Sequence, residues 1–122
     1  MDSEAIRQAV RSILVAVGED PAREGLNSTP DRVAELFADL YSGVGVDPLS
    51  VIREAKPLVS DENERGELVA LRDISFHSLC EHHLLPFEGT AHVVYQPAAG
   101  ILGLGTLAKL VEVSAARPQL QE

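Results

Sequence analysis

The sequence has little of what secreted and membrane proteins depend on. Its single cysteine, Cys80, excludes an internal disulfide framework and is compatible with a reducing compartment. The longest apolar run near the N-terminus covers only residues 13–17, whereas a membrane span needs roughly 20 apolar residues. The charged opening MDSEAIRQAV also has no apolar core of the length that a signal peptide requires. We therefore expect a soluble, cytoplasmic protein with no membrane partner.

Basic residues are scarce as well. Ten lysine and arginine residues stand against nineteen acidic residues, which gives a formal net charge of −9. Non-specific binding to nucleic acid requires the opposite balance, because basic side chains must neutralise the phosphates. No nucleic-acid partner is expected, and any anionic ligand must be held by locally placed donors against the general field of the chain.

What is present is enough for one domain with a core, since 45% of the 122 residues are hydrophobic. Apolar residues at helical spacing predict helices, with Thr29 as the N-cap of the second helix and Gly43 as its C-cap. Partial alternation with β-branched residues predicts strands. The predicted elements are helices over 4–17, 29–41, 49–55 and 107–116, and strands over 67–76 and 90–95 joined by a loop over 78–88. This order predicts an α+β fold.

The character of the sequence changes near Gly66. Residues 1–66 are interpreted as an N-terminal helical region with a connector, and residues 67–122 as the strand-bearing part of the same domain. Two strands and a few helices do not obviously close a sheet, and an unpaired sheet edge is a hazard. We therefore expect either that another chain completes the structure or that the polypeptide is incomplete at its C-terminus.

Most of the residues that can bind metal lie in the segment HSLCEHH, residues 77–83. Two residues separate Cys80 from His83, a spacing that allows a thiolate and an imidazole to turn toward one Zn²⁺. His82 could then act as a general acid or base, because histidine as a residue type changes its charge near working pH. The residues alone leave two interpretations open: a zinc site, and a buried cysteine beside solvated histidines.

Several longer motifs resemble the signature of GTP cyclohydrolase I, in the family's order and spacing. The matching segments are TPDRVA (29–34), YSG (41–43), SLCEHHLLPFEG (78–89), AHVVYQP (91–97), LAKLVE (107–112) and RPQLQE (117–122). The resemblance implies a tunnelling fold, in which an antiparallel sheet is backed by helices and preceded by a helical region. It also implies a ring-shaped homodecamer with active sites between subunits.

The resemblance further implies a zinc hydrolase that converts GTP and water to 7,8-dihydroneopterin triphosphate and formate. By position, Cys80 and His83 would be zinc ligands and His82 the acid/base that serves the purine ring. Gln121 and Glu122 fall where the family recognises guanine, although a solvated chain end is the alternative for Glu122. Arg32 falls where, in the family, a neighbouring subunit contacts the triphosphate; an ordinary surface charge is the alternative for this residue.

Three departures from the family pattern bear on activity. The family's third zinc ligand, a downstream cysteine, has no counterpart in the sequence. The family usually has Gly-Leu-Ser-Lys where this chain has residues 103–106 (GLGT), so a lysine for the triphosphate is replaced by Thr106. Lys109 is also expected to bind substrate at the triphosphate, but it stands where arginine is common in the family and lacks the two parallel hydrogen bonds that arginine offers a phosphate. We expect a fragment of a working cyclohydrolase with weak turnover by itself; the alternative is a short, impaired relative that acts as a purine- or pterin-binding or assembly subunit.

Overall fold

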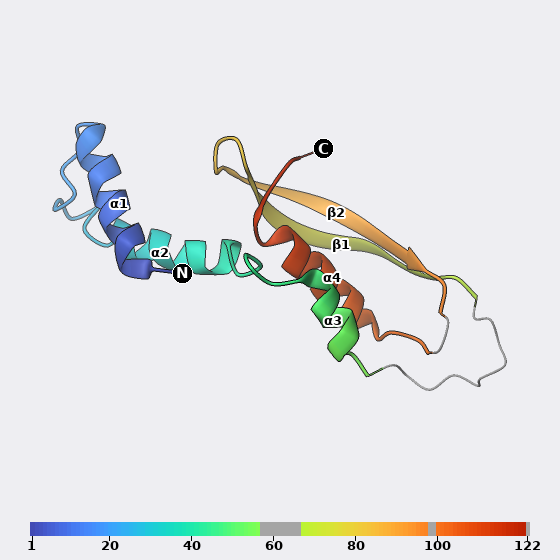
Figure 1. Ribbon diagram of the computed structural model, residues 1–122. Coiled ribbons are helices and arrows are strands. Elements are labelled where there is room, and N and C mark those ends of the chain that lie inside the picture. Colours follow the sequence, from blue (N-terminus) through green and yellow to red (C-terminus); the bar gives the residue numbers. More distant parts are fainter. Residues whose placement is uncertain (57–66, 98–99, 122) are drawn as a thin grey trace. The chain divides into compact units, whose positions relative to one another are not determined.

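The computed structural model describes residues 1–56, 67–97 and 100–121 (Figure 1). Contacts within the chain divide it into two compact units, Met1–Tyr41 and Ser42–Glu122. This division falls earlier than residue 66, because the short helix after Ser42 packs with the sheet-containing unit. The assignment of residues 67–122 to a catalytic domain stays a prediction.

The N-terminal unit consists of helices α1 (Ser3–Ala16) and α2 (Thr29–Leu40). Asp2 caps α1, where its carboxylate accepts a hydrogen bond from the Ala5 N–H at 3.0 Å. The N-cap of α2 is Ser28 rather than the predicted Thr29, and its side chain makes no capping bond. Pro30 suits the start of α2 because that position needs no N–H donor. Both predicted helices are confirmed to within about two residues.

The C-terminal unit contains the remaining elements. They are α3 (Pro48–Glu54), β1 (Val69–Cys80), β2 (Pro86–Tyr95), α4 (Leu104–Ala115) and β3 (Pro118–Gln119). The sheet order is β2-β1-β3, with β1 antiparallel to β2 and parallel to β3. The α+β class is confirmed, and the sheet is mixed rather than wholly antiparallel because β3 arrives from the end of α4.

The β1–β2 ribbon is longer than the two predicted strands. The predicted loop over 78–88 is wrong, because β1 continues to Cys80 and β2 begins at Pro86. Near the other end of the ribbon, the register shifts between Leu71 and Ile74, and Asp73 adopts a left-handed φ of 58°. The backbone N–H of Asp73 donates to Nδ1 of His92 at 3.1 Å across this bulge. His92 is thus a residue of β2 whose imidazole accepts a hydrogen bond at the bulge.

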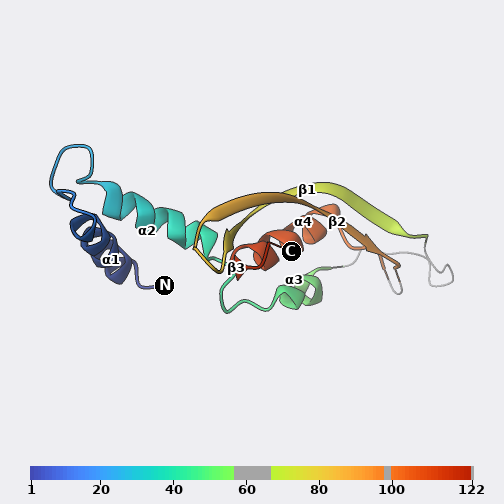
Figure 2. The same ribbon diagram turned by 90° about the horizontal axis from the view of Figure 1, so that it is seen from above.

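The core of the C-terminal unit lies between the ribbon and α4. Figure 2 shows the ribbon curving over α4, and α3 packs on α4. Leu79 of β1 is fully buried and Leu107 of α4 is 1% exposed, and Ser78 beside Leu79 is buried as well. The deepest packing is therefore at the end of β1 that carries Cys80. None of the helices that the structure describes is long and apolar enough to cross a membrane.

Candidate functional site

Cys80 is the last residue of β1 and is held by a tight turn. Its N–H donates to the Leu85 carbonyl and its own carbonyl accepts from the Leu84 N–H, both at 2.8 Å. Leu84 reaches this geometry with a left-handed φ of 56°, a conformation that residues with a side chain adopt only at a cost. The cysteine is buried at 7% exposure, whereas residues 81–85 of the turn are exposed. The turn therefore fixes a thiol at the edge of the core and leaves the histidines beside it open to solvent.

His83 is the partner of Cys80 in this turn. Sγ of Cys80 lies 3.8 Å from Nδ1 of His83. In tetrahedral zinc sites, bond lengths of about 2.3 Å to sulfur and about 2.0–2.1 Å to nitrogen place the two ligand atoms about 3.6 Å apart. The observed separation fits that spacing with only a small adjustment, so the pair suits a zinc ion. Among the residues that the structure describes, no group of three His, Cys, Asp or Glu side chains surrounds one point.

His82 lies between these two residues in the sequence and is exposed. Its ring centroid is 6.1 Å from that of His83, and the planes are nearly perpendicular. The imidazole is therefore next to the candidate zinc ligands without occupying their place. This arrangement leaves it accessible to exchange protons with a ligand.

The segment after α4 lies alongside this turn. Leu79 pairs with Pro118, and Cys80 pairs with Gln119, in the parallel β1–β3 ladder. The Glu81 N–H donates to the Gln119 carbonyl at 3.0 Å, beyond the end of β1. The structure thus brings the first part of the RPQLQE motif to the strand end that carries Cys80, and it places Gln121 two residues after β3.

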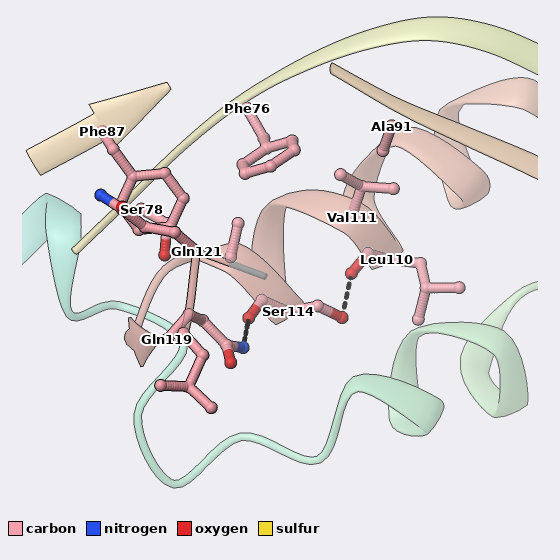
Figure 3. Close-up of a pocket in the computed structure, with 11 residues that line it drawn as sticks. Phe76, Ser78, Phe87, Ala91, Leu110, Val111, Ser114, Gln119 and Gln121 are labelled. Atoms are coloured by element: carbon pink, nitrogen blue, oxygen red, sulfur yellow. Dashed lines mark hydrogen bonds between the residues drawn. The ribbon is translucent and has the colours of Figure 1, made fainter. Parts of the chain in front are cut away.

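Gln121 borders a pocket of about 420 Å³ between the ribbon and α4 (Figure 3). The pocket is mostly apolar, with the rings of Phe76 and Phe87 on the ribbon side and Leu110 and Val111 on the helix side. Gln119 spans its rim, where its side-chain amide donates to the Ser114 carbonyl at 2.7 Å. Among the described residues, Gln121 is the only predicted site residue that lines the pocket. Glu122 lies outside the described residues.

The two predicted triphosphate residues lie elsewhere. Lys109 is exposed on α4, and its Nζ forms an ion pair with Oε1 of Glu112 at 2.9 Å. Arg32 is exposed on α2, in the N-terminal unit. Within the C-terminal unit, Lys109 is not part of the cluster formed by the Cys80 turn and the end of β3.

Sequence reasoning missed three residues that shape this cluster: Ser78, Leu84 and Arg117. Arg117 directly follows Ala116, the C-cap of α4, and a cation near that place is a recognised signal for a helix C-terminus. Leu84 carries no comparable signal, because left-handed residues are normally glycine or asparagine. Ser78 falls in the predicted loop over 78–88, so no signal in the sequence indicated its buried place in β1.

Comparison with known proteins decides the family. The sequence model of GTP cyclohydrolase I matches residues 6–122. The chain belongs to the GTP cyclohydrolase I family. It is 50% identical over its whole length to GTP cyclohydrolase 1 of Thermoanaerobacter pseudethanolicus and covers 63% of that protein. It is 53% identical over its whole length to the Bacillus subtilis protein of the same name and covers 62% of it. The chain thus spans somewhat less than two thirds of these curated GTP cyclohydrolase relatives.

Proposed function

We propose that the chain carries part of a zinc-dependent GTP cyclohydrolase I that converts GTP and water to 7,8-dihydroneopterin triphosphate and formate. This would be the first step of tetrahydrofolate and pterin biosynthesis, carried out in the cytoplasm by a ring-shaped homo-oligomer with a tunnelling fold. The observation that supports the proposal most directly is the 3.8 Å separation of Cys80 Sγ from His83 Nδ1 in a chain of this family. Relatives named GTP cyclohydrolase 1 support the choice of GTP as substrate.

Cys80 and His83 would hold the zinc ion. A bound zinc ion supplies a Lewis acid that brings the pKa of water close to neutrality. The burial of Cys80 limits solvent around the thiolate, and the hydrogen bonds of the turn keep its backbone in place. A further protein ligand, which catalytic zinc sites usually have, would come from outside the described residues.

His82 would move the proton that ring opening requires. At each of the two C–N bonds at C8, its exposed imidazole can take a proton from the water that adds to carbon and give it to the nitrogen that leaves, so the imidazole returns to its starting state. Because His82 is close to His83, its imidazole would lie near the part of the substrate that faces the zinc ligands. The role needs only a neutral-to-charged transition near working pH, which histidine provides.

The end of the chain would recognise the base. Guanine presents an N1–H and an exocyclic amine side by side, and the Glu122 carboxylate can accept from both. Gln121 lies next to it and already borders the ribbon–α4 pocket. For the triphosphate, Lys109 would have to exchange its ion pair with Glu112 for a phosphate oxygen, and Arg32 from a neighbouring subunit would add a second cation.

The decisive experiment compares metal content and turnover in single variants. We expect Cys80→Ala and His83→Ala to lose bound zinc and to lower formate release from GTP by more than the roughly 10–100-fold that loss of an outer partner costs. His82→Ala should keep its zinc and still lose about 10²–10⁴-fold in turnover, because only proton transfer is removed. Elemental analysis measures the zinc, and absorbance of the pterin product measures turnover.

His77→Ala is the matched control. His77 is also an exposed histidine of the ribbon, and its nearest acidic partner is Glu88, with Nε2 3.9 Å from the carboxylate oxygen. This variant should keep both zinc and turnover. If Cys80→Ala retained a full complement of zinc and full activity, the assignment of the metal ligands would be refuted.

A further inference from the structure

Arg117 occupies the point where three segments of the C-terminal unit meet. Its guanidinium NH2 nitrogen donates to the Val46 carbonyl at 2.8 Å and to the Val113 carbonyl at 3.2 Å. Val113 lies in the last turn of α4, where carbonyls lack helical partners and attract a cation. Nε of the same side chain is buried without a hydrogen-bond partner among the described residues. The guanidinium therefore joins α4 to the segment before α3 through two hydrogen bonds, while its buried Nε–H is left without an acceptor among the described residues.

The backbone of Arg117 makes the third connection, to β1. Its carbonyl accepts from Oγ of Ser78 at 3.1 Å, and Ser78 is only 1% exposed. The next two residues, Pro118 and Gln119, form β3 beside Leu79 and Cys80. A displacement of Arg117 would therefore be passed directly to the strand that adjoins the Cys80 turn.

The segment before α3 is held just as closely. The Gly43 N–H donates to the Ala116 carbonyl at 2.8 Å. A Cβ at Gly43 would lie 2.2 Å from the Val113 carbonyl oxygen, so the two backbones are in direct contact. The guanidinium of Arg117 thus binds carbonyls of two segments that are themselves in close contact, and the main chain of Arg117 continues directly into β3.

We propose that Arg117 is a positioning residue that holds β3 against the end of β1 and so sets the distance between the Cys80–His83 pair and Gln121. That this distance matters for guanine recognition rests on the function proposed above. The positioning of β3 by Arg117 rests only on the hydrogen bonds of Arg117 and Ser78. A purely stabilising role would affect the whole unit equally, whereas a positioning role acts on the β1–β3 junction.

Amide hydrogen exchange separates these two roles within a single variant. The Glu81 N–H bonds across to Gln119 of β3, whereas the Cys80 and Leu84 N–H groups bond within the turn. In Arg117→Met we expect exchange at Glu81 to accelerate about tenfold while exchange at Cys80 and Leu84 stays unchanged. Unchanged protection at Glu81, or equal loss at all three amides, would overturn the proposal.

Two further variants keep this test independent of folding problems. Ser78→Ala removes the hydroxyl bond to the Arg117 carbonyl and should selectively expose Glu81 in the same way. Arg117→Lys keeps a cation that can reach one of the two carbonyls and should restore part of the protection. The control is Arg72→Met, which alters an exposed arginine of β1 and should leave all three amides as they are.

The consequence for the ligand is measured as guanosine binding by the zinc-loaded protein. Arg117→Met should weaken guanosine affinity about tenfold while its zinc content stays that of the unaltered chain. Combined with Ser78→Ala, the loss should be less than the product of the two single losses, because both variants release the same strand. Equal guanosine affinity in Arg117→Met and the unaltered protein would overturn the positioning role in recognition. If the unaltered protein bound no guanosine, the proposed function would fail, and the exchange experiment would still decide whether Arg117 positions β3.

Discussion

The N-terminal unit, Met1–Tyr41, packs two helices with little burial, whereas the C-terminal unit, Ser42–Glu122, encloses a small core around one strand end. In the N-terminal unit the buried side chains of the described helices are Pro30 and Ala34, and α1 contributes none. An exposed ion pair between Arg7 and Asp31, at 2.6 Å, joins α1 to α2. In the C-terminal unit the buried residues of the described part include Ser78, Leu79, Cys80 and Leu107.

The difference shows where a reactive group can be placed with precision. Exposed ion pairs hold elements only loosely, because water and salt compete for both charges. Buried hydrogen bonds and closely packed side chains leave few alternative conformations to the residues that form them. The turn with the candidate zinc ligands directly follows the buried end of β1, whereas Arg32 is an exposed residue of the N-terminal unit. The structure therefore supplies a rigid frame for Cys80 and none for Arg32 within its own unit.

The largest expected effect is that of Leu107→Ala. Leu107 is 1% exposed, so its loss removes buried apolar surface and leaves a cavity, at a cost of about 2–5 kcal/mol in the free energy of unfolding. Ile13→Ala in α1 is the control, because Ile13 is 61% exposed and its truncation should cost no more than about 0.5 kcal/mol. Chemical denaturation followed by circular dichroism measures both. Equal costs would abolish the contrast between the two units.

Next in size is Gly43→Ala. The added Cβ would lie 2.2 Å from the Val113 carbonyl oxygen and 2.9 Å from that of Ala116, so the backbones must separate. We expect a loss of about 1–3 kcal/mol, of the size that overpacking usually costs. Gly105→Ala is the matched control, since that glycine lies in α4 with open space where the Cβ would be. It should stabilise the protein by about 0.5–1 kcal/mol, because alanine favours helix. If both changes stabilised the chain, the close contact at Gly43 would be disproved.

The smallest expected effect is the pH dependence of two exposed carboxylates, one in each unit. Arg53 and the Leu49 N–H hold the pKa of Asp47 below its ordinary value of 3.8, and Arg23 holds the pKa of Glu19 below its ordinary value of 4.5. Such groups stabilise the folded state above the unfolded-state pKa, and the contribution is lost as the pH falls through the lowered folded-state pKa. The midpoint of thermal unfolding should therefore fall in acid.

Asp47→Asn and Glu19→Gln should each flatten this acid dependence slightly and by similar amounts. Asparagine can still accept from the Leu49 N–H, so the change at Asp47 isolates the charge. The measurement is the thermal midpoint between about pH 6 and about pH 3. A much steeper dependence carried by Asp47 than by Glu19 would show that the unit containing the core also depends on exposed charge.

The helices and the two strands of the ribbon could be predicted from periodicity and capping residues, which are local properties. The predicted helix near 49–55 corresponds to Pro48–Glu54, and that over 4–17 to Ser3–Ala16. The end of β1 could not be predicted, because residues 78–80 are all buried. Contact with both α4 and β3 removes the alternation that marks a strand with one solvated face.

The candidate site divides in a similar way. The thiol, the imidazoles and their spacing are written in residues 80–83, so a zinc pair could be predicted from the sequence. The left-handed turn at Leu84 could not, because no glycine or asparagine marks it. The contacts of Arg117 could not be predicted from the sequence for a different reason. The Ser78–Arg117 hydrogen bond joins residues 39 positions apart.

By itself, the sequence determined the order of the four helices and the two ribbon strands, the family and the chemical identity of the candidate ligands, because each of these depends on neighbouring residues. Only the tertiary structure decided that β3 joins β1 in parallel and brings Gln119 beside Cys80. That pairing depends on hydrogen bonds between segments far apart in the chain. Such bonds are strongest where water is excluded, and Leu79 of β1 and Leu107 of α4 are both buried in this unit.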